Sequence, residues 1–358
     1  MGGITITSEL IGGLDQGAMG TAIAAMGEQV LDAAARVEKA LSSLTLPKKE
    51  TITNVILAGL GGSAIGGDLV RSYLHASLSI PFYINRTYRL PGFVGPGSLV
   101  IVSSYSGTTE ETLAMYEAAK SKGAQIVCLA TGGTVKEWAL RDGYPFVELP
   151  SGFQPRAALA YSFIPVLKIL EAIGLAPNQA AALKETASHL DTLCARYGTS
   201  SISDDNDALR LAKILQSKIP VIYSDCEYFD TVNIRWRGQI QENAKHVAFG
   251  NVLPEMNHNE INGWDFPIEL HKYFQVVFLR SSADEHSRVA LRFSVLKEVL
   301  TGKGVAVEEV SATGDSALSR MFSLIILGDW TSYYISLLSG VDPSPVPVIS
   351  LLKSRLAS

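Results

Sequence analysis

The sequence predicts an α/β fold in which helices cover a parallel β-sheet, and it predicts that this arrangement occurs twice. Short apolar runs alternate with helical patterns along most of the chain, which is typical of a parallel sheet. The same order of strands and helices recurs in the second half. The length of 358 residues also exceeds the ~250–300 residues at which a single core stops growing. We therefore expect two tandem domains.

Four segments follow from the pattern. Helical spacing over residues 17–43 ends at Pro47 and predicts an N-terminal helical arm, residues 1–50. The first domain, residues 51–198, has expected strands at 53–58, 81–84, 99–102, 125–129 and 146–149, and expected helices at 64–74, 110–120, 155–172 and 180–195. The second domain, residues 199–340, begins with a polar linker at 199–207 and has expected strands at 219–223, 274–279 and 304–310, and helices at 231–245, 285–300 and 316–338. A C-terminal helical tail is expected at residues 341–358.

Composition and charge limit the partners of the protein. A formal charge of −5 provides no basic surface for nucleic acid or an anionic membrane, and no apolar run approaches the ~20 residues of a membrane span. Cys128, Cys194 and Cys226 are scattered, with no CxxC motif, which argues against a zinc site and fits a reducing compartment. No basic residue precedes Arg36, so no targeting signal is indicated. We expect a cytoplasmic protein that binds small molecules or copies of itself.

A turn rich in hydroxyl groups stands at the end of the third expected strand. The sequence Ser103-Ser104-Tyr105-Ser106-Gly107-Thr108-Thr109-Glu110-Glu111 leads from an apolar run into a helix. Backbone N–H groups at a helix N-terminus, together with the helix dipole and several hydroxyl donors, can bind an anion such as phosphate. The alternative is a helix terminus with more capping residues than it needs.

A second turn, Gly59-Leu60-Gly61-Gly62-Ser63-Ala64, follows the first expected strand. It matches a weak dinucleotide-binding pattern, but the next strand ends in Asn85-Arg86 where NAD binding requires an acid. Close approach of the backbone to a ligand, with Ser63 presenting its hydroxyl, is the interpretation we favour. A purely structural role in tight turning remains open.

These motifs resemble those of the sugar isomerase (SIS) fold, and more narrowly those of the bifunctional phosphoglucose/phosphomannose isomerases. The resemblance includes Gly61-Gly62-Ser63, the Ser104–Glu111 turn and Pro155-Arg156-Ala157-Ala158-Leu159. It extends to Glu242-Asn243-Ala244-Lys245 and to Pro254-Glu255-Met256-Asn257-His258-Asn259-Glu260. It implies two flavodoxin-like SIS subdomains, each a parallel-sheet αβα sandwich, in a cytoplasmic homodimer.

The resemblance also implies an activity in glycolysis and gluconeogenesis. This activity is metal-independent aldose–ketose isomerisation of glucose 6-phosphate, and of mannose 6-phosphate, to fructose 6-phosphate through a cis-enediolate, without a cofactor. By position, Gly62, Ser63, Ser104, Ser106 and Thr109 correspond to substrate-binding residues, and Thr331 lines the sugar pocket. Glu242 corresponds to the base, Arg156 to the cation that stabilises the enediolate, and His258 to the ring-opening residue contributed across the dimer. Where related isomerases have a lysine two helical turns after Thr331, this chain has Leu338, and its next lysine is Lys353.

Each assignment has a structural alternative. Glu242 could be a surface acid paired with Lys245, and His258 a loop histidine bonded to the backbone. Arg156 could form an ion pair with an acid such as Glu148, and Thr331 could bond to a helix carbonyl.

Two other functions also fit the fold. An amino-sugar phosphate isomerase would share the site, and a non-catalytic sugar-phosphate-binding protein would bind hexose phosphates without converting them. The second would tolerate loss of Glu242, whereas an isomerase would not.

Overall fold

The computed structural model describes residues 5–356 and divides into two compact units. The first unit is Met26–Ser188. The second unit combines the described parts of Met1–Ala25 and His189–Ser358. The expected N-terminal arm is therefore shared, because α1 (Ser8–Leu14) and α2 (Met19–Ala24) belong to the second unit and α3 (Met26–Leu41) to the first. The domain boundaries expected after residues 50, 198 and 340 remain predictions.

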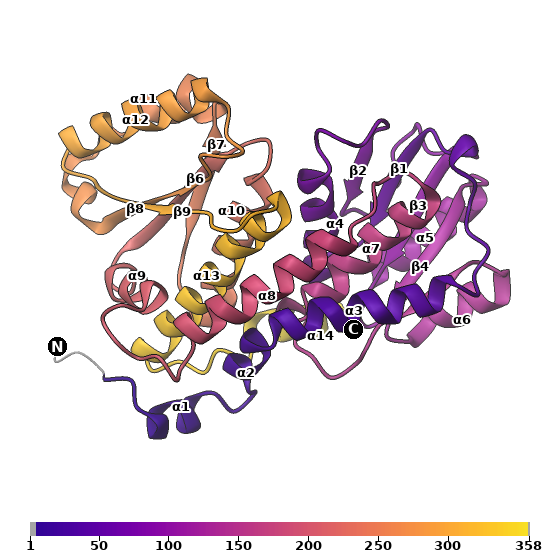
Figure 1. The fold of residues 1–358 in the computed structure, drawn as a ribbon, viewed down its shortest axis with the longest axis horizontal. Helices are drawn as coiled ribbons and strands as arrows, with labels where there is room; N and C mark the ends of the chain where they lie inside the picture. Colours follow the sequence, from indigo (N-terminus) through magenta and orange to yellow (C-terminus); the bar gives the residue numbers. More distant parts are fainter. Residues whose placement is uncertain (1–4, 357–358) are drawn as a thin grey trace. The chain divides into compact units, whose positions relative to one another are not determined.

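The first unit is built on a five-stranded parallel sheet with the order β2-β1-β3-β4-β5 (Figure 1). Its strands are β1 (Asn54–Ala58), β2 (Phe82–Asn85), β3 (Ser98–Ser103), β4 (Gln125–Ala130) and β5 (Phe146–Glu148). Strand β1 lies between its neighbours, so that Ile56 pairs with Tyr83 of β2 and with Val100 of β3. This is the order of doubly wound, flavodoxin-like sheets.

Helices cover both faces of the first sheet. They are α3, η1 (Lys49–Thr51), α4 (Gly61–Tyr73), α5 (Glu110–Ser121), α6 (Gly133–Asp142), η2 (Pro155–Ala157), α7 (Ala160–Ile173) and the beginning of α8 (Ala180–Tyr197). Met115 of α5 and Val135 of α6 pack on the face that presents Ile56 and Val100. Helix α4 lies on the opposite face, where Gly67 closely approaches Leu57. Side chains alternate between the two faces along a strand, and because helices cover both faces, all residues of β3 and all but Asn54 of β1 are buried.

The second unit repeats this plan with a four-stranded parallel sheet of order β7-β6-β8-β9. The strands are β6 (Ile219–Asp225), β7 (Phe249–Leu253), β8 (Phe274–Arg280) and β9 (Ala306–Ser311). Besides α1 and α2, its helices are α9 (Asp207–Leu215), α10 (Asp230–Ala244), η3 (Glu255–His258), α11 (Glu260–Gly263), η4 (Ile268–Tyr273), α12 (Ser287–Gly302), α13 (Ala317–Leu338) and α14 (Pro347–Leu356). The prediction of a duplicated parallel α/β fold is confirmed.

Helix α13 is the core helix of the second unit. Its 22 residues are long and apolar enough to cross a membrane by length and composition, contrary to our expectation that no run approaches a span. The apolar window is nevertheless completely buried inside the unit, where α13 packs against α9 and α10. An apolar surface buried on all sides is typical of a central helix in a soluble core.

Several short elements have no counterpart among the expected ones. Strand β7 and helices α6 and α9 were not predicted. The helix expected from Pro155 is divided into η2 and α7, and the long N-terminal pattern into α2 and α3 with a break at Ala25. Strand β7 contains Gly250 and Asn251, which interrupt the apolar pattern that identifies strands.

Candidate active site

The glycine turn follows β1 and the hydroxyl turn follows β3, and these two strands are adjacent in the sheet. The chain runs from β1 to β2 on one side and from β3 to β4 on the other. Ligands of doubly wound sheets bind at such a switch point, beyond the carboxyl ends of the strands. The two turns are joined directly, since the backbone N–H of Tyr105 donates to Ser63 Oγ at 3.1 Å. The close approach also requires Gly59, because a Cβ at that position would lie 2.6 Å from the carbonyl oxygen of Ser103. The structure therefore places Ser63 beside the hydroxyl turn.

The hydroxyl turn has a defined internal geometry. Ser104 Oγ and Thr109 Oγ1 share a hydrogen bond of 3.0 Å, and the N–H of Gly107 donates to Ser104 Oγ at 3.1 Å. Ser106 Oγ accepts from the N–H and the hydroxyl of Thr108. Ser104 is buried, whereas Ser106 and Thr108 are exposed. Ser104, Ser106 and Thr109 are thus held together within one turn.

Helix α5 begins at this turn without a side-chain cap. Thr109 occupies the N-cap position, but no described side chain accepts a hydrogen bond there from the first turn of α5. The N-terminal N–H groups and the positive end of the helix dipole thus support an anion site over the capping alternative. Ser103 does not contribute, because it is fully buried in β3 and its hydroxyl has no hydrogen-bond partner among the described residues.

Tyr105 connects this turn to residues 150–157, which include Arg156 and form the Arg156 segment. Its hydroxyl donates to the carbonyl oxygen of Pro150 at 2.9 Å and accepts from the N–H of Phe153 at 3.1 Å. Burial raises the pKa of Tyr105, so the phenol remains a donor at neutral pH. We did not predict this role from the sequence, although Tyr105 lies inside the motif that we identified.

The Arg156 segment also contacts the glycine turn. A Cβ at Gly62 would lie 3.0 Å from the carbonyl oxygen of Pro155, so a larger residue would displace one of the two segments. Arg156 is buried in η2, and Glu148, the acid suggested as its partner, instead pairs with Lys136 at 2.7 Å. The first unit therefore brings together Gly62, Ser63, the hydroxyl turn and the Arg156 segment.

The dinucleotide alternative for the glycine turn receives no support at the end of β2. The guanidinium of Arg86, which could have received a 2′-phosphate, forms an ion pair with the carboxylate of Asp68 on α4. The Asn85 amide donates to the carbonyl oxygen of Arg89 at 3.0 Å. Both side chains have structural partners within the first unit.

In the second unit, Glu242 lies in the last turn of α10 and lines a cavity of 530 Å³. The cavity is bounded by the end of α10, by residues leading into β7 and by Val346–Ile349 around the start of α14. Lys245, which we considered as a surface partner of Glu242, donates to the carbonyl oxygens of Asp342 at 2.6 Å and Asn243 at 3.2 Å. A half-buried carboxylate at a cavity wall is suited to acid–base chemistry.

Buried hydrogen bonds between α10 and α13 hold the end of α10 in place. Asn243, next to Glu242, donates through Nδ2 to Ser332 Oγ at 2.9 Å. Arg235 and Gln239 both donate to the buried carboxylate of Asp329, at 2.6 and 3.0 Å. Thr331 is fully buried in α13, and its hydroxyl bonds to no described residue, so it does not bond to a helix carbonyl. Thr331 does not line the Glu242 cavity.

Helix α14 carries a lysine one turn beyond a residue that lines the Glu242 cavity. Leu338, at the position where related isomerases were expected to have a lysine, is buried at the end of α13. Lys353 is exposed on α14, seven residues after Val346 and four after Ile349. Because Ile349 lies within α14, the four-residue spacing puts Lys353 on the same face of the helix as that cavity-lining residue.

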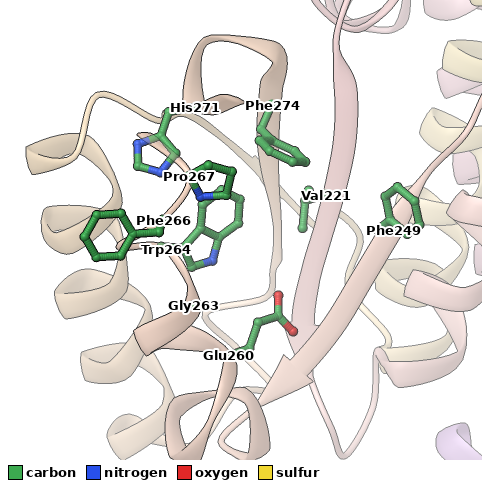
Figure 2. A pocket seen from close by; sticks show the side chains of 9 residues that line it. All are labelled: Val221, Phe249, Glu260, Gly263, Trp264, Phe266, Pro267, His271 and Phe274. Atoms are coloured by element: carbon green, nitrogen blue, oxygen red, sulfur yellow. The ribbon is translucent and has the colours of Figure 1, made fainter. Parts of the chain in front are cut away.

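His258 is the last residue of η3 and is exposed. It does not line the Glu242 cavity within this chain. The segment that follows it borders a separate cavity of 240 Å³, whose lining includes Glu260, Trp264 and His271 (Figure 2). Each of these three polar side chains already has a hydrogen-bond partner, and aromatic and aliphatic side chains form much of the remaining wall. Residues 5–356 contain no group of three or more His, Cys, Asp or Glu side chains that could hold a metal ion.

Comparison with known proteins shows the family of this chain. Residues 204–356 match the model of the bacterial phospho-glucose isomerase C-terminal SIS domain. The bifunctional phosphoglucose/phosphomannose isomerase of Caldicellulosiruptor bescii is 44% identical over 310 residues, which are 87% of this chain and 91% of that protein. The chain belongs to the family of bifunctional phosphoglucose/phosphomannose isomerases. The Aquifex aeolicus member is 35% identical over 84% of this chain and 90% of its own length.

The fold of this family member is shared with more distant proteins. The crystal structure of tagatose-6-phosphate ketose/aldose isomerase from Escherichia coli superimposes with a TM-score of 0.71 at 15% identity, and covers 90% of this chain and 93% of that one. At this identity the likeness concerns the fold alone. The resemblance inferred from the motifs and the SIS fold are both confirmed.

Proposed function

We propose that this protein interconverts glucose 6-phosphate and fructose 6-phosphate, and mannose 6-phosphate and fructose 6-phosphate, without a metal or cofactor. The main support for the proposal is the hydroxyl turn at the switch point of the first sheet, which is hydrogen-bonded to Ser63 and to the Arg156 segment. The relatives of the chain are named phosphoglucose/phosphomannose isomerases. Ser63, Ser104, Ser106 and Thr109 would bind the 6-phosphate through hydroxyl and backbone donors.

The proposed chemistry assigns one task to each ionisable residue. His258 opens the sugar ring by giving a proton to the ring oxygen and accepting one from the C1 hydroxyl. Glu242 removes the proton from C2 and returns it to C1 of the enediolate, while the O2 proton passes to O1. Arg156 stabilises the negative charge that develops on the enediolate oxygens. Glucose and mannose phosphates differ only at C2, so both form the same enediolate.

A coupled assay for fructose 6-phosphate tests this proposal. We expect product from glucose 6-phosphate and from mannose 6-phosphate, at rates that excess EDTA does not change. Glu242→Gln should abolish both reactions while still binding 6-phosphogluconate, because it removes only the base. Absence of product from both sugars, or full turnover by Glu242→Gln, would contradict the proposal.

We also propose that the enzyme acts in the cytoplasm as a homodimer in which His258 enters the partner's site. The exposure of His258, its absence from the lining of the Glu242 cavity and the exposed apolar residues Val348, Leu351 and Leu352 of α14 support this arrangement. Cys128, Cys194 and Cys226 are all free, which suits a reducing compartment.

Mixing two inactive variants tests the shared site. Glu242→Gln and His258→Ala, unfolded and refolded together in equal amounts, would form heterodimers that each contain one intact site. Random pairing makes half of the dimers heterodimers, and in each of these one of the two sites combines the intact Glu242 of one chain with the intact His258 of the other. About a quarter of wild-type activity should therefore return. No recovery despite demonstrated heterodimers would show that Glu242 and His258 act within the same chain.

A further inference from the structure

We propose that Glu260 is a positioning residue for His258. Its carboxylate anchors the segment between Pro254 and Trp264 to strands β6 and β7, and thereby fixes the imidazole that opens the sugar ring. This inference rests on the proposed role of His258.

Both carboxylate oxygens of Glu260 are bonded to the sheet. Oε1 accepts a hydrogen bond from the hydroxyl of Tyr223 on β6, and Oε2 accepts one from Nδ2 of Asn251 on β7 at 2.6 Å. Glu260 is the first residue of α11 and lies two residues after His258. Two hydrogen bonds from adjacent strands to one carboxylate fix its position and its orientation.

Tyr223 is itself immobilised. Its side chain is fully buried in the core of the second unit, and its hydroxyl accepts from the indole Nε1 of Trp264 at 3.1 Å. Burial raises the pKa of Tyr223, and the hydrogen bond to Glu260 raises it further. The phenol therefore remains protonated and able to donate. Glu260 begins the short helix α11 and Trp264 directly follows it, and both line the cavity shown in Figure 2. One tyrosine therefore ties both ends of α11 to the sheet.

The residues just before His258 are also held in place, mainly by packing. Met256 is fully buried in the same core, and Asn257 accepts a long hydrogen bond of 3.4 Å from Arg292 of α12. His258 is exposed, so its position depends on these neighbours more than on its own burial. Misplacing a reacting group by about 1 Å can lower an enzymatic rate by about 100-fold, so loss of the Glu260 anchor should slow ring opening.

An exposed acid in the same segment provides a matched control. Glu255 lies three residues before His258, and its only described contact is with Nδ2 of Asn259 at 3.5 Å. Glu255→Gln and Glu260→Gln remove the same charge near His258, but only the second disturbs the anchor. Tyr223→Phe keeps the Glu260 charge and removes one of its two donors.

Ring opening can be measured separately from isomerisation. Exchange between the α and β anomers of glucose 6-phosphate requires ring opening but no C2 proton transfer, and NMR exchange spectroscopy measures its rate. Glu260→Gln should lower the enzyme-dependent anomer exchange and kcat by about tenfold or more, with KM nearly unchanged. Tyr223→Phe should lower both rates by a smaller factor, and Glu255→Gln should leave both unchanged. Glu242→Gln should retain anomer exchange and lose isomerisation.

The outcomes separate the two proposals. Equal anomer exchange in Glu255→Gln and Glu260→Gln would overturn the anchoring role, as would wild-type exchange in Glu260→Gln. If Glu260→Gln does not fold, as judged by thermal unfolding, Tyr223→Phe decides, and wild-type exchange in that variant overturns the inference. Wild-type exchange in His258→Ala would instead reject the proposed role of His258 itself.

Discussion

At the residue scale, phosphate binding in the first unit depends on a few hydroxyl groups with defined neighbours. Ser104 and Thr109 share a hydrogen bond in front of the uncapped terminus of α5. The hydroxyls are held in place before any ligand arrives, because Ser104 is buried and also accepts from the N–H of Gly107. Pre-organised donors bind an anion without the cost of ordering them.

The first prediction concerns these two hydroxyls. Hydrogen bonds to charged groups contribute about 1.5–3 kcal/mol each, so Ser104→Ala with Thr109→Ala should raise KM for glucose 6-phosphate by at least about tenfold. Steady-state kinetics and titration with 6-phosphogluconate measure the effect. Thr301→Ala, which removes an exposed hydroxyl bonded only to carbonyls of α12, is the control. Unchanged affinity in the double variant would place the phosphate elsewhere.

The second prediction concerns the lysine on α14. Lys353 shares a helix face with Ile349, which lines the Glu242 cavity, so we expect its ammonium to stabilise negative charge developing there. Lys353→Met should lower kcat by about 100- to 1,000-fold, the range typical of removing one electrostatic stabiliser. Lys184→Met removes the same charge from an exposed position on α8 that lines neither cavity, and should retain activity. Equal losses in both variants would remove Lys353 from the site.

At the element scale, close backbone approaches decide how the turns of the first unit pack. Gly107 adopts a positive φ of 72°, and a Cβ there would lie 1.9 Å from the carbonyl oxygen of Gly132. The hydroxyl turn therefore lies directly against the turn before α6. No side chain larger than hydrogen fits between them.

The third prediction compares two glycines with similar backbone angles. Gly123 has a φ of 67°, but a Cβ there would meet only Pro96 at 3.8 Å. Gly123→Ala should lower the free energy of unfolding by about 1 kcal/mol through backbone strain alone, within the 1–3 kcal/mol typical of such positions. Gly107→Ala should cost more and should also raise KM, because the hydroxyl turn must move. Urea unfolding and kinetics measure both, and equal behaviour of the two variants would contradict the packing argument.

At the scale of the whole molecule, each unit depends on a core that combines apolar packing with a few buried polar contacts. In the second unit, Arg235 and Asp329 form a buried ion pair of 2.6 Å between α10 and α13. Burial raises the pKa of Asp329, while Arg235 and Gln239 oppose this effect by stabilising the carboxylate. Breaking such a pair leaves one buried charge without its partner.

The fourth prediction follows from this pair. Asp329→Leu should lower the free energy of unfolding by about 3–5 kcal/mol, because Arg235 then remains buried without a carboxylate. The double substitution Asp329→Leu with Arg235→Met should cost less than Asp329→Leu alone, since both charges are removed. Chemical denaturation of the single and double variants provides the comparison. A double variant less stable than both single variants would show that the pair contributes more than it costs to bury.

The sequence by itself determined the fold class and the family, and it supplied the candidate site residues, which remain predictions. Apolar runs and helical periodicity are local properties, and the hydroxyl turn and the Asn-His-Asn-Glu motif are contiguous, so both can be recognised without a structure. Strand β7 and helix α9 were missed because Gly250 and Asn251 interrupt one pattern, and the polar stretch before Asp207 obscures the start of the other.

Only the tertiary structure decided which distant side chains meet. The bonds from Tyr105 to the Pro150–Phe153 segment, from Asn243 to Ser332, and from Tyr223 and Asn251 to Glu260 join residues that no local pattern connects. The same applies to the Glu242 cavity, whose wall includes residues 346–349 because of how the start of α14 packs. Such contacts arise when separate elements pack into one core, so they depend on three-dimensional register and not on spacing along the chain.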